Sequence, residues 1–242
     1  MLLGCGQFDS ENGPLSGLTF DFDLAADCAC GYEDGLLTQV PITIDGGGHS
    51  IRRADESPPF RIFHVATAGY LTLDDVTLRN GIGDPHGGLI YNRGLLVVKG
   101  GSLRHGFALG DGGAIYNLGS TEIEDVLLAF NEAEIQGGAI SSAEDDCGGF
   151  FSDCRVFIDR SWLFLNEAYR GGGIANGPGW LSVSHSQLAA NSATEVGGAI
   201  LSYGTPELSL PVNTFLVTAS TLRGNDAFWG SAIYSADVVA WV

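Results

Sequence analysis

The sequence is poor in basic residues and has no dense cluster of them. Eleven Lys and Arg stand against 29 Asp and Glu, and the formal net charge at pH 7 is −18. The nearest approach to a basic group is Arg52, Arg53 and Arg61. Such an acidic chain is repelled by phosphate backbones and by anionic lipid. We therefore expect no nucleic-acid partner and no binding to membrane surfaces.

The chain also lacks long apolar runs and any helical periodicity. A membrane-spanning helix needs about 20 continuous apolar residues, whereas Gly or Asp interrupts the longest runs here. We therefore expect no transmembrane segment. One methionine and 8 prolines accompany 36 glycines, a composition that indicates one regular architecture punctuated by glycine.

Cysteine is scarce and odd in number, with five residues. Cys147 and Cys154 bracket a short Gly/Phe-rich segment, which predicts a disulfide between them and hence an oxidising compartment. Free thiols in a loop are the alternative. The pairing of the other three cysteines stays open: Cys5, Cys28 and Cys30.

Two sequence elements recur along the chain. The tetrapeptide Gly-Gly-x-Ile begins at Gly87, Gly112, Gly137, Gly171 and Gly197, with a variant at Gly230. Before each copy stands the pattern apolar-x-apolar-x-x-small-x-apolar, which begins at Leu71, Leu96, Thr121, Val156, Leu181 and Phe215. The start-to-start spacings of this second element are 25, 25, 35, 25 and 34 residues. The underlying repeat is therefore about 25 residues long.

This repeat predicts the fold. Period-two alternation of Val, Ile, Leu and Thr over three to four residues indicates short strands. A unit of this length cannot bury its own inner face, so it must stack on copies of itself. We expect an all-β, right-handed parallel β-helix of seven to eight rungs over residues 41–242, after an irregular segment and first degenerate rung over 1–40. The apolar end, Val238–Val242, has no polar cap, and we expect the natural protein to continue or to associate end to end there.

Two columns of polar residues are predicted to form hydrogen-bonded ladders between rungs. The first lies two residues after the repeated Ile and contains Asn92, Asn117, Ser142, Asn176, Ser202 and Ser235. The second contains Asn80, Asn131, Asn166, Asn191 and Asn225, with His105 in its second rung. Stacked amides and hydroxyls can satisfy turn backbone groups that the strands leave open. We interpret both columns as structural.

The repeat resembles known families. Gly-Gly-Ala-Ile with Asn131-Glu132-Ala133 or Asn191-Ser192-Ala193 upstream resembles the polymorphic outer-membrane protein repeats of bacteria. Ile44-Asp45-Gly46-Gly47-Gly48 and Leu71-Thr72-Leu73 are similar to the opening rungs of secreted, pectin-lyase-like β-helix proteins. The resemblance covers roughly residues 40 to 235 and implies a cell-surface adhesin associated with the outer membrane.

Because β-helices also include polysaccharide lyases and hydrolases, we looked for their carboxylate and basic clusters. Asp74 and Asp75 are adjacent, but neighbours on a strand point to opposite faces, which favours a solvated corner. His86 and His105 occupy corresponding loops one rung apart. An atypical carbohydrate-active enzyme built on these four residues is the alternative function. No cofactor is implied, and zinc and phosphate-loop spacings are absent from the sequence.

Two insertions of about ten residues, within 141–155 and 203–213, follow the Gly-Gly-x-Ile strand in rungs two apart. They should project from one face, where repeat proteins place variable recognition loops. Candidate binding residues there are Asp145, Asp146, Phe150, Phe151, Asp153, Tyr203 and Glu207. Aromatic rings beside carboxylates suit a glycan or protein ligand, and Asp145 and Asp146 are candidate Ca²⁺ ligands. We expect a non-catalytic, extracellular recognition domain, with a purely structural spacer as a third reading.

Overall fold

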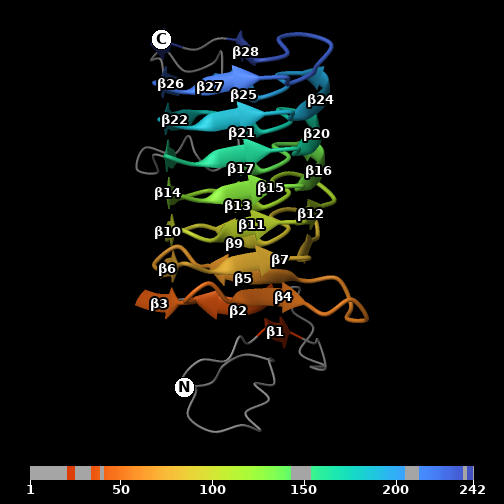
Figure 1. The fold of residues 1–242 in the computed structure, drawn as a ribbon, viewed down its shortest axis with the longest axis vertical. Coiled ribbons are helices and arrows are strands. Elements are labelled where there is room, and N and C mark those ends of the chain that lie inside the picture. Colours follow the sequence, from red (N-terminus) through yellow and green to blue (C-terminus); the bar gives the residue numbers. More distant parts are fainter. Residues whose placement is uncertain are drawn as a thin grey trace, which may run out of the picture.

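The protein is a parallel β-helix, as predicted. A computed structural model describes residues 41–142, 154–204 and 213–236, together with the backbone of three further strands at 21–24, 34–38 and 239–241. All helical and strand elements in these ranges are β-strands, and they stack as successive turns of one solenoid (Figure 1).

The strands form four sheets, called sheets I to IV here. Sheet I contains β3 (Pro41–Asp45), β6 (Tyr70–Asp74), β10 (Leu95–Lys99), β14 (Ser120–Glu124), β18 (Arg155–Asp159), β22 (Gly179–Ser184), β26 (Asn213–Thr218) and β29 (Val239–Trp241). Sheet II contains β1 (Asp21–Leu24), β4 (Ser50–Arg53), β7 (Thr77–Arg79), β11 (Ser102–Arg104), β15 (Leu127–Ala129), β19 (Trp162–Phe164), β23 (Gln187–Ala189) and β27 (Thr221–Arg223). Sheet III contains β8 (Ile82–Gly83), β12 (Phe107–Ala108), β16 (Glu132–Gln136), β20 (Glu167–Arg170) and β24 (Ser192–Val196). Sheet IV contains β2 (Asp34–Thr38), β5 (Arg61–Val65), β9 (Ile90–Asn92), β13 (Ile115–Asn117), β17 (Ile140–Ser142), β21 (Ile174–Asn176), β25 (Ile200–Tyr203) and β28 (Ile233–Ala236).

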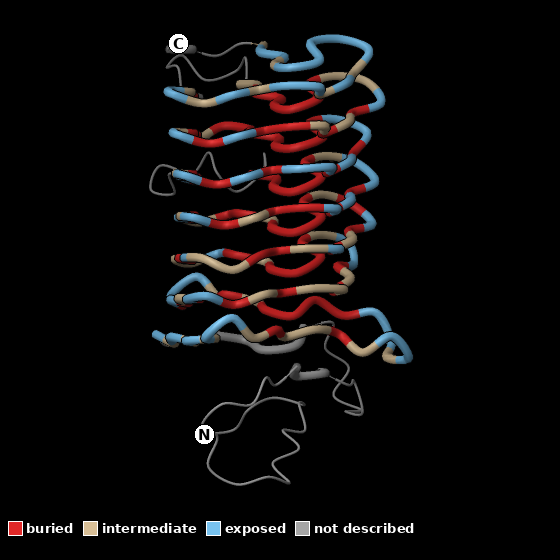
Figure 2. Tube along the Cα trace, viewed as in Figure 1, coloured by how far each residue is buried: buried red, intermediate tan, exposed pale blue. Residues whose placement is uncertain are grey.

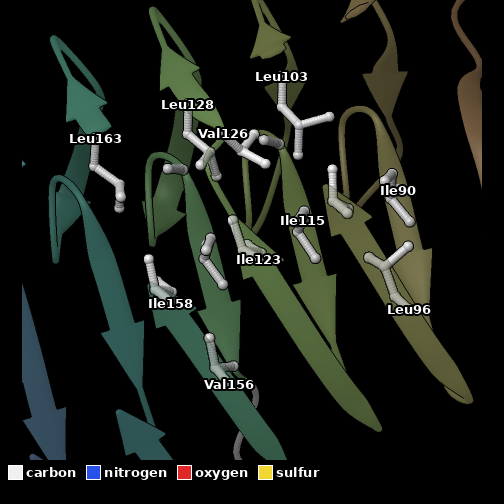
Figure 3. Packing of buried hydrophobic residues seen from close by; sticks show 14 of the residues in the cluster. Ile90, Leu96, Leu103, Ile115, Ile123, Val126, Leu128, Val156, Ile158 and Leu163 are labelled. Carbon is white, nitrogen blue, oxygen red and sulfur yellow. The ribbon is translucent and has the colours of Figure 1, made fainter. Parts of the chain in front are cut away.

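From β6 to β25, each turn runs through sheets I, II, III and IV in that order. Equivalent residues of successive turns pair in register, so that Ile90, Ile115 and Ile140 form one column on sheet IV. These side chains are fully buried, as are the leucines of the matching column on sheet II (Figure 3). Figure 2 shows the burial concentrated inside the stack, while corners and the last turn are exposed. The apolar columns form one continuous core.

The glycines of Gly-Gly-x-Ile stand where the chain passes from sheet III to sheet IV. The first has a positive φ, 71° at Gly112. At the second, a Cβ added to Gly113 would lie 2.2 Å from the carbonyl oxygen of Gly138 in the next turn. No side chain fits at that distance. The repeated pair therefore reflects a left-handed turn followed by close backbone contact between turns.

The first predicted ladder is present at the end of sheet IV. Asn92 Nδ2 donates to Asn117 Oδ1 at 2.9 Å, and both residues are fully buried. Asn117 Nδ2 donates to Ser142 Oγ at 3.5 Å, and Asn176 Nδ2 donates to Ser202 Oγ at 3.4 Å. The last member, Ser235, is exposed. The column joins turns and also holds the corner leading to sheet I, where Asn117 Nδ2 bonds to the carbonyl of Gly119 at 3.0 Å.

The second ladder is continuous but shorter than predicted. Asn131, Asn166, Asn191 and Asn225 each join the next, through Nδ2 to Oδ1 bonds of 2.9 to 3.0 Å. Asn80 and His105 do not belong to it. The register Thr77↔Ser102↔Leu127 aligns them with Phe130, at a left-handed position one residue earlier.

Glycines take the ladder position in the two earlier turns, for a packing reason. Gly106 donates its backbone N–H to Asn131 Oδ1 at 2.9 Å, so the amide column ends against it. A Cβ on Gly106 would lie 2.2 Å from the carbonyl oxygen of Gly113 and 2.8 Å from Cγ of Leu89, the buried residue at the x position of Gly-Gly-x-Ile. Later turns carry a small residue at that position: Ala114, Ala139, Gly173, Ala199 or Ala232. The Gly113 carbonyl and the large Leu89 side chain therefore leave no room for an inward amide at Gly106.

A serine ladder, missed from the sequence, lies at the corner between sheets I and II. Ser161 Oγ accepts the N–H of Val126 at 3.1 Å, and Ser186 Oγ accepts the N–H of Ser161 at 3.0 Å. Ser220 Oγ in turn accepts the N–H of Ser186 at 3.0 Å. The residue before each serine has a positive φ: Arg160, His185 and Ala219. Both corners thus follow one rule, a left-handed residue followed by an inward acceptor.

Candidate functional site: an acidic groove on sheet I

A shallow groove of about 290 Å³ lies on the outer face of sheet I, across β10, β14, β18 and β22. The apolar residues of these strands, such as Leu96, Val98, Val156 and Ile158, face the core and are at most 1 % exposed. Alternation therefore turns the intervening residues outward. The strand register arranges them in two columns, Val97, Glu122, Phe157 and Ser182 in one and Lys99, Glu124, Asp159 and Ser184 in the other.

The first column combines a ring with a carboxylate. The Phe157 residue is 36 % exposed and lies in register with Glu122 on the neighbouring strand. Within the described residues, Glu122 has neither an ion pair nor a side-chain hydrogen bond, so its oxygens are open to a ligand. Trp180, 41 % exposed, lies on the next strand in register with Arg155. An aromatic face beside open acceptors suits a ligand that has an apolar face and hydroxyl donors.

The second column ends in an ion-pair network at the corner between sheets I and II. The Arg160 guanidinium, held at a left-handed position, contacts Asp125 at 3.1 Å and also bonds to Glu124 and Asp159. Lys99 Nζ lies 4.0 Å from Glu124. The hydrogen bonds from Arg160 to Asp125 and Glu124 raise the pKa of Arg160. The network fixes the orientation of the groove's charged wall.

Asp159 is poised to accept hydrogen bonds and not to donate a proton. Hydrogen bonds from His185 and from Ser184 lower the pKa of the Asp159 carboxyl, with a further contribution from the Arg160 charge. Its Oδ1 atom lies 2.9 Å from His185 Nδ1 and 2.7 Å from Ser184 Oγ. Because both partners bond to the same oxygen, His185 is not arranged as a base for Ser184. A general acid of a hydrolase would need the opposite shift of the pKa.

Both insertions precede strands of this sheet in the chain. One separates β17 from β18 and the other separates β25 from β26, so each enters sheet I at the beginning of a strand. The prediction that both leave from the same corner is confirmed by these strand bounds. Most of the candidate binding residues lie outside the described residues: Asp145, Asp146, Phe150, Phe151, Asp153 and Glu207.

Two predicted residues at the ends of the insertions are described. Tyr203, the last residue of β25, is half-buried, and its hydroxyl donates to Gln136 Oε1 at 3.0 Å. This hydrogen bond links the Tyr203 ring to the end of β16 in sheet III. Cys154 is buried and disulfide-bonded, whereas the predicted partner Cys147 lies outside the described residues.

The structure does not bring the four residues of the enzyme alternative together. Asp74 and Asp75 are exposed at the corner between sheets I and II, as expected for a solvated corner. His105 follows β11 at the next corner, where its ring stacks on Phe130 at 5.2 Å. His86 lies between β8 and β9, in the connection from sheet III to sheet IV.

His86 belongs to a separate aromatic cluster outside sheet IV. Its ring stacks on Tyr116 with centroids 4.3 Å apart, and its Nδ1 accepts the N–H of Asp111 at 3.0 Å. Burial, and secondarily the Arg61 charge, lower the pKa of His86. Arg61 lies over the ring of Tyr91, 5.0 Å from its centroid. Because His86 Nδ1 accepts the Asp111 N–H, the neutral imidazole carries its proton on Nε2, and Oδ2 of Asp111 lies 3.4 Å from Nδ1.

Three further findings concern metal binding, membrane-spanning helices and similarity to known proteins. Among the described residues, no group of three or more His, Cys, Asp or Glu could hold a metal ion. Over the same residues, no helix is long and apolar enough to cross a membrane. Comparison with known proteins finds no match to a family model, a curated protein or a solved structure. The function must therefore be inferred from the geometry.

Proposed function

We propose that the protein is a non-catalytic, extracellular recognition domain whose sheet I groove binds an uncharged glycan. The observation that carries the proposal is the pairing of the exposed Phe157 ring with the open Glu122 carboxylate. A sugar ring presents an apolar face for the aromatic ring and hydroxyl donors for the carboxylate, Ser182 and Ser184.

The charges favour an uncharged ligand at this site. Glu122, Glu124 and Asp159 outnumber Lys99 along the groove, and the whole chain carries a net charge of −18. An anionic sugar would be repelled there. One insertion directly precedes β18 in the chain and the other precedes β26, and we propose that they add to the ligand contacts of sheet I.

Two further observations fit an exported protein. The disulfide at Cys154 is typical of oxidising compartments. The likeness of the repeat to polymorphic outer-membrane protein repeats is compatible with display at a bacterial cell surface. A cell-surface adhesin is therefore the setting that we propose for this domain.

Calorimetric titration with uncharged oligosaccharides of several linkage types tests the proposal. For a ligand that binds, Phe157→Ala should weaken the affinity at least about tenfold, or 1.4 kcal/mol, and Glu122→Gln should weaken it less. Tyr169→Ala is the matched control, because this ring is 45 % exposed but lies on sheet III. Binding that survives Phe157→Ala, or no binding to any uncharged oligosaccharide, would refute the proposal.

A further inference from the structure

The outer face of sheet II has a charge opposite to that of the molecule. Arg52, Arg79 and Arg104 pair in register on β4, β7 and β11, and form one column. They face outward because the intervening Leu78 and Leu103 are fully buried. Arg223 occupies the equivalent position on β27.

No Asp or Glu stands at an outward position of sheet II from β4 to β27. These positions are Ser50, Arg52, Thr77, Arg79, Ser102, Arg104, Leu127, Ala129, Trp162, Phe164, Gln187, Ala189, Thr221 and Arg223. Four of the 11 basic residues of the chain thus lie on one face, and the strands from β4 to β27 add no acidic residue to it. The excess of acidic residues elsewhere makes this the face at which an anion meets least repulsion.

Arg104, the last arginine of the column, is the best placed to bind an anion. Arg52 is nearer to carboxylates, since it forms an ion pair with Asp55 at 3.8 Å and pairs in register with Asp23 of β1. Arg104 has no ion-pair partner among the described residues. Its Nε is buried while the side chain as a whole is half exposed, so the stem lies on the sheet and the exposed part is the outer end of the guanidinium. That planar end can bind a carboxylate or a sulfate through two hydrogen bonds.

Aromatic rings continue the face beyond the arginines. The ring of His105, the residue after Arg104, stacks on Phe130, and Phe130 packs edge to face against Phe164 at 6.3 Å. Phe130 is 46 % exposed, Trp162 57 % and Phe164 40 %. A ligand that lies along the solenoid axis would therefore meet guanidinium groups over β7 and β11 and rings over β15 and β19.

We propose that sheet II binds an anionic polysaccharide, with its charged groups at Arg79 and Arg104 and its sugar rings on Phe130, Trp162 and Phe164. The exposed rings favour a sugar polymer over a purely ionic partner, because they add an apolar contact that salt does not screen. Nucleic acid is disfavoured, since its binders commonly make about six to ten phosphate contacts. This site is independent of the groove on sheet I.

Three polymers of one backbone test the site: dextran sulfate, carboxymethyl-dextran and unmodified dextran. In calorimetric titrations at low salt, at least one charged polymer should bind and unmodified dextran should bind much more weakly. Arg104→Gln should weaken binding about tenfold, as expected for loss of a charge-assisted hydrogen-bonded pair. Trp162→Ala should weaken the binding that remains at high salt. Comparison of the affinities for dextran sulfate and carboxymethyl-dextran shows whether the site prefers sulfate or carboxylate.

The control is Arg170→Gln, which removes an exposed arginine that pairs with Glu195 on sheet III. It should change the affinity less than about twofold, and Phe157→Ala on sheet I should also leave it unchanged. Circular dichroism of every variant verifies the fold. Equal losses in Arg104→Gln and Arg170→Gln, or no loss in Arg104→Gln, would overturn the proposal. Equally tight binding of duplex DNA or anionic lipid vesicles through Arg104 would overturn its assignment to a polysaccharide.

Discussion

The side-chain amide of Asn131 donates a 2.9 Å hydrogen bond to Oδ1 of Asn166 in the next turn. The same oxygen accepts the backbone N–H of Asn131 at 3.1 Å. Asn166 Nδ2 also donates to the carbonyl of Leu128 and to Asn191 Oδ1. The Asn166 amide therefore satisfies backbone groups at the corner of the preceding turn and hydrogen-bonds to the amides of both neighbouring turns.

Asn166→Ala should lower the free energy of unfolding by about 3 kcal/mol, because it leaves several buried polar groups without partners. Chemical denaturation monitored by circular dichroism measures this loss. Asn80→Gly is the matched control: it keeps the left-handed turn, lies outside the ladder and should cost less than about 0.5 kcal/mol. A similar loss of unfolding free energy in both variants would mean that the hydrogen bonds of the Asn166 amide contribute little to stability.

Gly113→Ala should strongly destabilise the protein, as should alanine at the equivalent Gly88 or Gly172, where an added Cβ meets backbone atoms at similar distances. The added methyl would collide with backbone atoms of the next turn at 2.2 to 2.6 Å, and neither strand can move alone. A loss of at least about 3 kcal/mol is expected, at the upper end for overpacking. Gly224→Ala separates this collision from backbone strain, because φ is 60° there and nothing lies within 4 Å of the added Cβ. It should cost about 1 kcal/mol; an equal cost at both sites would contradict the collision.

The fold was predictable because its main constraint acts on the backbone. Close contact between turns admits only glycine at Gly113, and the sequence therefore repeats its glycines at the period of the solenoid. The ladders were less predictable. Neighbouring backbone and an apolar side chain such as Leu89 decide whether a turn has room for an inward amide, and spacing alone does not show this.

The two proposed binding faces were not predicted from the sequence, for a different reason. The apolar pattern was used to find the core, although the residues between its members, such as Glu122 and Phe157, define the outer face of sheet I by the same alternation. Arg52, Arg79 and Arg104 are 27 and 25 residues apart, so they form a column only after the rungs are aligned. The net charge of the whole chain gives no indication of such a column of arginines.

His86 should make the stability of the protein depend on pH. Its pKa is lowered in the folded state, so the unfolded chain binds more protons between the folded pKa and the ordinary value of 6.5. The contribution of the neutral ring is therefore fully present above pH 6.5 and is lost as the pH falls through the folded pKa. His86→Gln should lose less stability than the wild type between pH 7.5 and pH 5.5, measured by thermal unfolding. Parallel pH profiles would exclude this role.

Deletion of residues 204–212 tests whether the insertion serves recognition or folding. In the turn of β13 and β14, two residues, Leu118 and Gly119, connect Asn117 to Ser120. The deletion would leave Tyr203 and Asn213 as the corresponding link between Ser202 and Thr214. The shortened corner can therefore close without disturbing the pairing of β25 with β21 or of β26 with β22. Because loop closure depends only weakly on loop length, the melting temperature should change by no more than about 4 °C.

The same deletion should weaken glycan binding to sheet I at least about tenfold if the insertion forms part of the binding edge. Binding to charged dextran on sheet II should stay as in the wild type, which provides an internal control for folding. Loss of both activities together with a large drop in melting temperature would show that the insertion stabilises the solenoid. Unchanged glycan binding with a native melting temperature would place recognition on the strands alone, with Phe157 and Glu122 as its centre.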